Sequence, residues 1–229
     1  MDRLVVGPGP NPDPANDEGT RSLEVRWIRP GPVPDGMIER LGPFVEELEE
    51  REDRYLVDPW LPELGVKIRG EVQLDLKAYR GSPGDFLVDG LGTGVLEMWE
   101  KWTFPLADGA LPTPLTSRWL GVHKARRRRS FGIVDARAVE RPLGDADLPG
   151  CTVELTEATI ADEAWWTLCF EATGSVAGLD RELLATAEFL LRDDGLPAEL
   201  HLDAGDSMSY VRWFGSRRGE PRGRQPATA

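Results

Sequence analysis

The chain has 229 residues, a length that suits one large domain, and its 40 acidic and 27 basic residues give a formal net charge of −13. Hydrophobic residues make up 40% and charged residues 29%, which excludes wholesale disorder. No run approaches the roughly 20 apolar residues of a membrane helix, so we expect a cytoplasmic protein without a membrane partner. The acidity also argues against a protein that coats nucleic acid.

Glycine, proline and aspartate dominate residues 1–21, and residues 215–229 share this character with basic charge. We expect two disordered tails around a single domain at residues 22–214. Within that domain, two-residue hydrophobic alternation predicts strands. They are expected at about 22–29, 53–58, 64–70, 72–79, 94–104, 118–131, 151–158 and 165–173.

Helical periodicity is confined to two stretches. A first helix is expected from Asp35, broken or restarted at Gly42-Pro43 and continuing through the acidic run FVEELEE. Asp180 is a suitable N-cap for a second helix, with Gly195 just beyond its end. The glycine cluster at 90–94 precedes an alternating strand rather than a helix, which predicts a hairpin loop and not a phosphate-binding loop.

Alternating charge gives several strands one ionic face. In Gly65-Val66-Lys67-Ile68-Arg69 the cations Lys67 and Arg69 alternate with apolar residues, and the segment 122–129 places Lys124, Arg126 and Arg128 on one side. Two architectures fit this pattern. The charges could cover the solvent face of an antiparallel sandwich, or they could point into a closed barrel whose apolar outer face is covered by helices or by a second copy of the chain in a homodimer.

The order of several motifs resembles that of the CYTH family, the triphosphate tunnel metalloenzymes, over about residues 22–214. The motifs are REDRYLVDPWLPELGVKIRG, LDLK, VHKARRRR, TLCFEA with the helix around LLATAEFLL, DDGL, and finally Ser209-Tyr210. The resemblance implies an α+β protein built on an antiparallel, closed or nearly closed barrel of about eight strands. It also implies a small phosphorylated ligand or inorganic polyphosphate inside that barrel.

The site residues follow from the resemblance. Phosphate-binding roles are implied for Arg26, Lys67, Arg69, Lys77, Lys124, Arg126 and Arg128. Catalytic roles are implied for Glu24, Glu97 and Glu171, which together with Glu154 would hold Mg²⁺ or Mn²⁺ for hydrolysis of a triphosphate. Glu157 competes with Glu154 for the cavity position, because the register of that strand is open.

The chain departs from the family pattern at three carboxylate positions, which are Ser22, Trp99 and Cys169 here. Capture of phosphate needs only the cations, whereas hydrolysis needs a positioned metal and water. A noncatalytic polyanion-binding protein on the same fold is therefore the alternative to a metal-dependent triphosphatase. A sandwich interaction module with outward charges is the third reading.

Overall fold

The computed structural model describes residues 19–41, 48–89, 92–107, 118–143, 148–191 and 200–219. The expected helix break at Gly42-Pro43 and most of both expected tails lie outside the described residues. Nine strands run through the described part: β1 Thr20–Pro30, β2 Glu49–Leu56, β3 Leu64–Arg69, β4 Gln73–Val88, β5 Gly92–Pro105, β6 Trp119–Val134, β7 Arg137–Arg141, β8 Gly150–Ile160 and β9 Glu163–Thr173. The helices are α1 Met37–Arg40, α2 Leu179–Leu191 and α3 Tyr210–Gly219, with short 3₁₀ turns at Val176–Gly178 and Ala204–Asp206.

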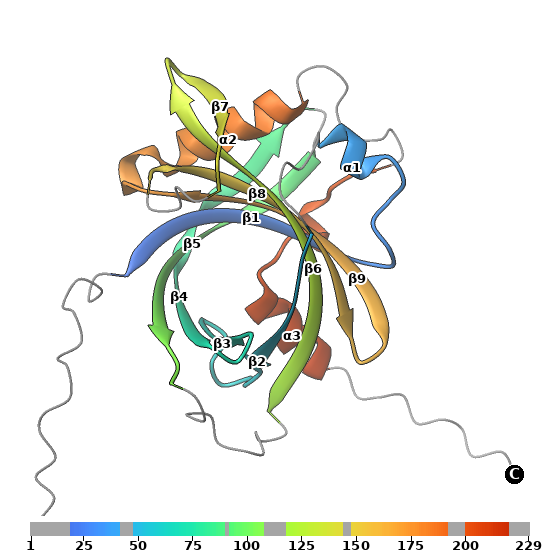
Figure 1. Ribbon diagram of the computed structural model, residues 1–229. Coiled ribbons are helices and arrows are strands. Elements are labelled where there is room, and N and C mark those ends of the chain that lie inside the picture. Colours follow the sequence, from blue (N-terminus) through green and yellow to red (C-terminus); the bar gives the residue numbers. More distant parts are fainter. Residues whose placement is uncertain are drawn as a thin grey trace, which may run out of the picture.

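The strands form one antiparallel sheet in the order β2-β3-β4-β5-β1-β9-β8-β6-β7, and a further pairing between β2 and β6 closes it. Eight strands therefore make a barrel, and β7 pairs with β6 outside it (Figure 1). The predicted closed antiparallel barrel with flanking helices is confirmed, and the sandwich reading is wrong because β2 has a partner on both sides.

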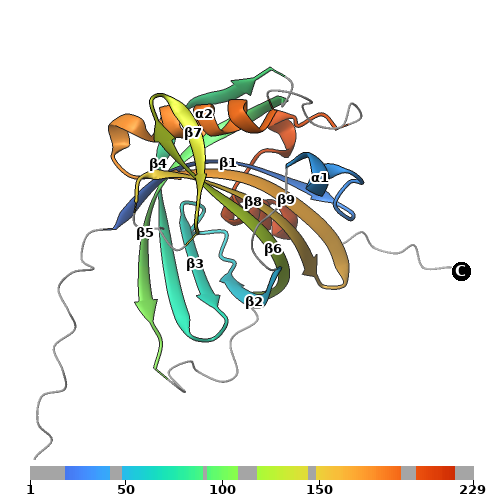
Figure 2. The same cartoon turned by 45° about the horizontal axis from the view of Figure 1, so that its top comes forward.

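Strand parity separates an ionic interior from an apolar exterior. On β1, Glu24 and Arg26 face the interior, while Leu23, Val25 and Trp27 belong to the outer hydrophobic core. Helix α2 covers this outer face over β1, β8 and β9 (Figure 2), with Leu183 fully buried against them. Burial of the outer strand positions under α2 leaves the charged positions inside the barrel, as alternation requires.

The long β4–β5 hairpin contributes residues both to the barrel interior and to the outer hydrophobic core. Register shifts between Tyr79 and Gly84 bend it, and Gly81 and Gly84 adopt positive φ angles of 111° and 143° there. Beyond the bend, Phe86 packs edge-on against Trp27 in the outer core. The glycine-rich stretch around Gly92 is followed by a strand, as predicted for a hairpin.

Helix α3 fills one end of the barrel. Its Tyr210, Trp213 and Phe214 pack with Tyr55, Val122 and Ile160 in a second buried cluster, and Figure 1 shows the helix within the ring of strands. The helix extends to Gly219, five residues into the range expected to be a tail. Arg217 anchors it there, because its guanidinium pairs with Glu163 and lies over Trp165 and Trp213.

Three other expectations differ from the structure. Among the described residues the first helix spans Met37–Arg40, and Glu49 and Glu50, expected in its acidic half, begin β2 instead. The second helix forms as predicted but begins at Leu179, one residue before the expected N-cap. Strand β7 was not predicted. Both cysteines are buried and free, and no helix among the described residues has the length and apolarity to cross a membrane.

Candidate functional site

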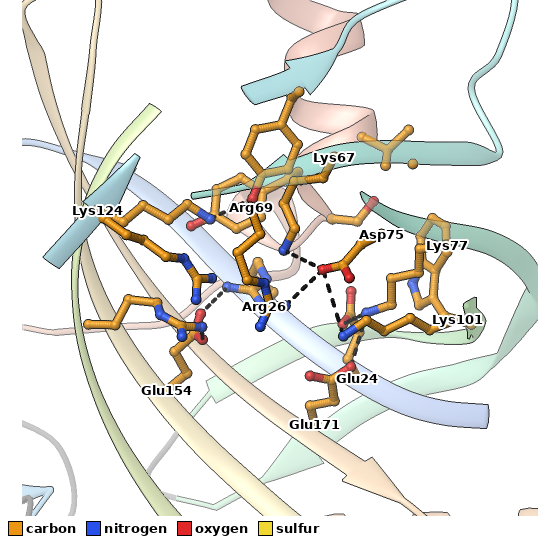
Figure 3. Close-up of a pocket in the computed structure, with 18 residues that line it drawn as sticks. Glu24, Arg26, Lys67, Arg69, Asp75, Lys77, Lys101, Lys124, Glu154 and Glu171 are labelled. Atoms are coloured by element: carbon orange, nitrogen blue, oxygen red, sulfur yellow. Dashed lines mark hydrogen bonds and ion pairs between the residues drawn. The ribbon is translucent and has the colours of Figure 1, made fainter. Parts of the chain in front are cut away.

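The barrel interior contains a charged cavity of about 130 Å³ (Figure 3). Its cationic lining residues are Arg26, Arg51, Lys67, Arg69, Lys77, Lys101, Lys124 and Arg126. Its carboxylates are Glu24, Asp75, Glu154 and Glu171. Cations thus outnumber carboxylates two to one in the wall of the cavity, although the whole chain carries a charge of −13. Six strands and the first turn of α3 supply most of these positions.

Six of the seven residues expected to bind phosphate line this cavity: Arg26, Lys67, Arg69, Lys77, Lys124 and Arg126. The seventh, Arg128, is outside the cavity lining, and its guanidinium lies 3.3 Å from the Glu49 carboxylate. The open choice on β8 is also resolved. Glu154 lines the cavity, whereas Glu157 lies outside the barrel and accepts a 2.7 Å hydrogen bond from Arg127.

One wall of the cavity is an ion-pair group centred on Glu154. Arg126 donates to Glu154 Oε2 at 2.8 Å, and Arg26 donates to Oε1 at 3.3 Å. Arg126 also donates to Glu49, and Arg26 to the Thr167 hydroxyl at 3.1 Å. The two guanidinium groups outweigh the cost of burial and hold the pKa of Glu154 well below its usual range. This group is close to neutral.

A second group is formed by Lys77, Glu24 and Glu171, and we name it the Lys77 bridge. Lys77 Nζ donates to Glu24 Oε2 at 2.5 Å and to Glu171 Oε1 at 3.1 Å. The ammonium lowers the pKa of Glu171 to about 2. The two carboxylates in turn raise the pKa of Lys77 against the opposing effect of burial. Lys77 and Glu171 are therefore both ionised at neutral pH.

The third carboxylate expected in the catalytic set is directed elsewhere. Glu97 is the register partner of Glu24, which is also the register partner of Glu171, so the three lie abreast on β5, β1 and β9. The Glu97 side chain is nevertheless paired with Arg212 of α3, at 3.2 Å, and is absent from the cavity lining. Burial and the neighbouring Glu24 raise the pKa of Glu97.

The remaining cations surround two buried aspartates, and we name this group the Asp53–Asp75 cluster. Asp53 lies 3.5 Å from Lys124 Nζ and 3.8 Å from Lys67 Nζ. Asp75 lies 3.3 Å from Lys67, 2.8 Å from Arg69 and 3.8 Å from Lys101. Four cations therefore share two carboxylates. Arg51 also reaches Asp53 but divides its charge with Glu49.

The pKa values in this cluster reflect the excess of positive charge. Burial, followed by repulsion from Arg69, lowers the pKa of Lys67 to about 7. Burial likewise lowers the pKa values of Lys101 and Lys124, with Lys124 well below its usual range. For these three lysines the cost of desolvation thus exceeds the attraction of the two aspartates, which is the electrostatic state expected of a site that accepts an anion.

Sequence reasoning missed several residues of this site. Asp53 and Arg51 lie in the run EEREDRYL, where charged residues occupy both faces and hide the alternation. Tyr55 is on the same strand and accepts a 2.6 Å hydrogen bond from Lys124, whose ammonium also lies 3.9 Å from the centre of the Tyr210 ring. Asp75 lies two residues before Lys77 on β4, so strand alternation could have placed it on the inward face.

The described residues do not fit a divalent ion as they are placed. No group of three His, Cys, Asp or Glu side chains in the described ranges is arranged to hold one. Of the four glutamates expected as ligands, Glu154 is engaged by two arginines and Glu97 by Arg212. The oxygens of Glu24 and Glu171 both face the Lys77 ammonium. A metal would have to displace these cations.

Comparisons with known proteins leave the family open. No family model matches the chain, and no curated protein matches it. Among solved structures, it is similar to a chain titled "Monoclinic Mimivirus Capping Enzyme Triphosphatase", with 14% sequence identity, 78% of this chain and 91% of that chain covered, and a TM-score of 0.41. A likeness this distant adds nothing to the argument from geometry, and membership of the CYTH family stays a prediction from sequence.

Proposed function

We propose that the protein binds a small phosphorylated polyanion of the triphosphate class inside its barrel. The observation that carries this proposal is the Asp53–Asp75 cluster, in which four cations that line the cavity share two buried carboxylates. An anion bound there would supply the missing negative charge and would raise the depressed pKa values of Lys67, Lys101 and Lys124.

The chemistry of the cations favours phosphate over a single carboxylate. Arg69 offers a planar guanidinium, which matches two oxygens of one phosphate, and Lys67 and Lys124 offer compact ammonium groups. A ligand with several linked phosphates can contact these groups together. The aromatic packing of α3 closes one end of the barrel and limits the ligand to a small molecule or the end of a chain.

Isothermal titration with tripolyphosphate tests the proposal. Arg69→Ala removes charge-assisted hydrogen bonds worth about 1.5–3 kcal/mol, so the affinity should fall roughly 10- to 150-fold. Arg127→Ala is the matched control, because Arg127 lies on a barrel strand but pairs with Glu157 on the outside, and its affinity should equal that of the parent. Equal binding by Arg69→Ala, Arg126→Ala and the parent would refute the assignment.

A second candidate is hydrolysis of the bound triphosphate with Mg²⁺ or Mn²⁺, which the resemblance in sequence implies. The observation that favours it is the row of Glu24, Glu97 and Glu171 on adjacent strands. Phosphate release from tripolyphosphate and from a nucleoside triphosphate, assayed with either ion, tests this candidate. Release that depends on the ion and collapses in Glu171→Gln would support it, and no release with either ion would leave the binding function alone.

A further inference from the structure

Lys77 Nζ lies between the carboxylates of Glu24 and Glu171, which are register partners on the adjacent strands β1 and β9 and point into the cavity side by side. Its Nζ lies 2.5 Å from Glu24 Oε2 and 3.1 Å from Glu171 Oε1, and both contacts are hydrogen bonds (Figure 3). The Glu24 side chain is only 4% exposed and that of Lys77 24%. The Lys77 bridge is therefore an integral part of the cavity wall and not a solvated surface pair.

A divalent ion shared by the same two carboxylates would need the same space. Mg²⁺ lies about 2.0–2.1 Å from its oxygen ligands, and the ammonium already lies close to both oxygens. The ion and the ammonium would also repel each other strongly at such a separation in a partly desolvated site. Occupation by Lys77 and occupation by a metal are thus mutually exclusive.

The neighbouring inward positions provide no third ligand to favour the metal. Trp99, completely buried, places its indole ring 5.6 Å from Lys77 Nζ, on the side next to Glu24. Glu97, on the same strand, is held by Arg212. Cys169, two residues before Glu171, is buried and is not among the residues that line the cavity.

We propose that Lys77 is a built-in counter-ion that takes the place of a divalent metal, so that the cavity captures its phosphorylated ligand without one. This inference rests on the proposed function and specifies its cofactor requirement. The single charge of Lys77 neutralises part of the Glu24 and Glu171 charge, which would otherwise repel an anion entering beside the Asp53–Asp75 cluster. The lysine does so permanently, whatever the metal concentration.

Two measurements on the parent protein test the proposal. The dissociation constant for tripolyphosphate, measured by calorimetry, should agree within about twofold between EDTA and Mg²⁺ buffers. In the Mg²⁺ buffer the concentration of free tripolyphosphate is corrected for the fraction bound to Mg²⁺. Electron paramagnetic resonance should detect no Mn²⁺ site that depends on Glu171, so the parent and Glu171→Gln should give the same Mn²⁺ titration. Ligand binding that vanishes in EDTA, or a Mn²⁺ site abolished by Glu171→Gln, would overturn the proposal.

Variants of Lys77 then locate the effect. Lys77→Met keeps the length of the side chain and removes the charge, so Mn²⁺ affinity should rise at least about tenfold and Mn²⁺ should raise the melting temperature. Lys77→Arg retains the charge and should gain no Mn²⁺ site. The double variant Lys77→Met/Glu171→Gln should lose the gain. If Lys77→Met folds but gains no Mn²⁺ affinity, the proposal is wrong.

Failure of the proposed function gives a different pattern. If the parent binds no tripolyphosphate with or without metal, the cavity is not a polyphosphate site. The Mn²⁺ titrations of the parent and of Lys77→Met still report whether the ammonium excludes a metal, because they use the metal alone as the probe.

Discussion

Raising the pH should weaken the binding of polyphosphate through Lys67. In the ligand-free protein the pKa of Lys67 is about 7, whereas a bound polyanion favours the ammonium and returns the pKa toward the ordinary lysine value of about 10.4. Between pH 6 and pH 8.5 the free protein loses this proton and the complex keeps it. The linkage relation then gives a roughly 30-fold loss of affinity, about 2 kcal/mol. Binding at pH 8 should take up about 0.9 proton at Lys67, against about 0.1 at pH 6.

Titrations in buffers of different ionisation enthalpy measure this proton uptake directly. The phosphates of the ligand titrate in the same pH range, so Lys67→Met is the necessary reference. It should take up about 0.9 proton fewer at pH 8 and show a correspondingly flatter affinity profile. The groups that face Lys67 and remain in the variant are Asp53, Tyr55, Arg69, Asp75, Lys101 and Lys124. Identical proton uptake by the parent and the variant would refute the reasoning.

The same residue should affect the free protein in the opposite direction. Since the folded-state pKa of Lys67 is depressed, the unfolded chain binds more protons between about pH 7 and pH 10. The free energy of unfolding should therefore rise with pH in that window. Thermal unfolding of the ligand-free protein between pH 6.5 and 9 should show this rise, and Lys67→Met should reduce it.

Three further outcomes follow from the packing and the charges. Leu183→Ala should lower the free energy of unfolding in urea by about 2–5 kcal/mol because Leu183, on α2, is fully buried against the outer face of the barrel, while Leu184→Ala, at a position 37% exposed on the same helix, should cost much less. Gly92→Ala should lower the melting temperature markedly, because Gly92 has a φ of +127° and a Cβ there would lie 2.1 Å from the Leu202 carbonyl oxygen; Gly205→Ala, where a Cβ meets nothing within 4 Å, is its control. Asp75→Asn should destabilise the protein at pH 7. The pKa of Asp75 is depressed in the folded state, so its carboxylate stabilises the fold above the unfolded-state pKa of about 4, and this stabilisation is lost as the pH falls toward the folded-state pKa. The difference in free energy of unfolding between the parent and Asp75→Asn should therefore shrink below about pH 4.

Alternation predicted the barrel interior well where each strand has one apolar face. On β1 and β3 the outward residues Val25 and Ile68 are buried, and the inward positions that alternate with them, such as Arg26 and Lys67, are charged. Strand β2 lacks that contrast. Its outward positions Glu50 and Glu52 are charged like its inward ones, so its first half carries no hydrophobic period. It is a strand because β3 and β6 pair with it as the barrel closes, and that pairing is a long-range effect.

Strand β7 and helix α3 were also not predicted. Strand β7 follows a turn at Asp135-Ala136, where both residues have positive φ, at 48° and 61°, and neither is the glycine that normally marks such a turn. Helix α3 was not predicted although its buried residues Tyr210, Trp213 and Phe214 have helical spacing, because this stripe covers little more than one turn and is followed by Gly215, in the range expected to be a tail. The position of Glu97 could not be foreseen for the same reason, since its partner Arg212 belongs to α3.

The carboxylates inside the cavity stabilise the folded, ligand-free barrel, although they would repel an anionic ligand. Eight buried or half-buried cations with no counter-charge would repel one another and lose hydration, which disfavours the closed barrel. Glu154 and the Lys77 bridge remove most of that penalty on their side of the cavity. The remaining excess is concentrated where Lys67, Lys101 and Lys124 have depressed pKa values. An anionic ligand bound there relieves the repulsion among these cations, and this relief contributes to its affinity. Because the ligand also raises the pKa values of the lysines, its binding should be accompanied by proton uptake.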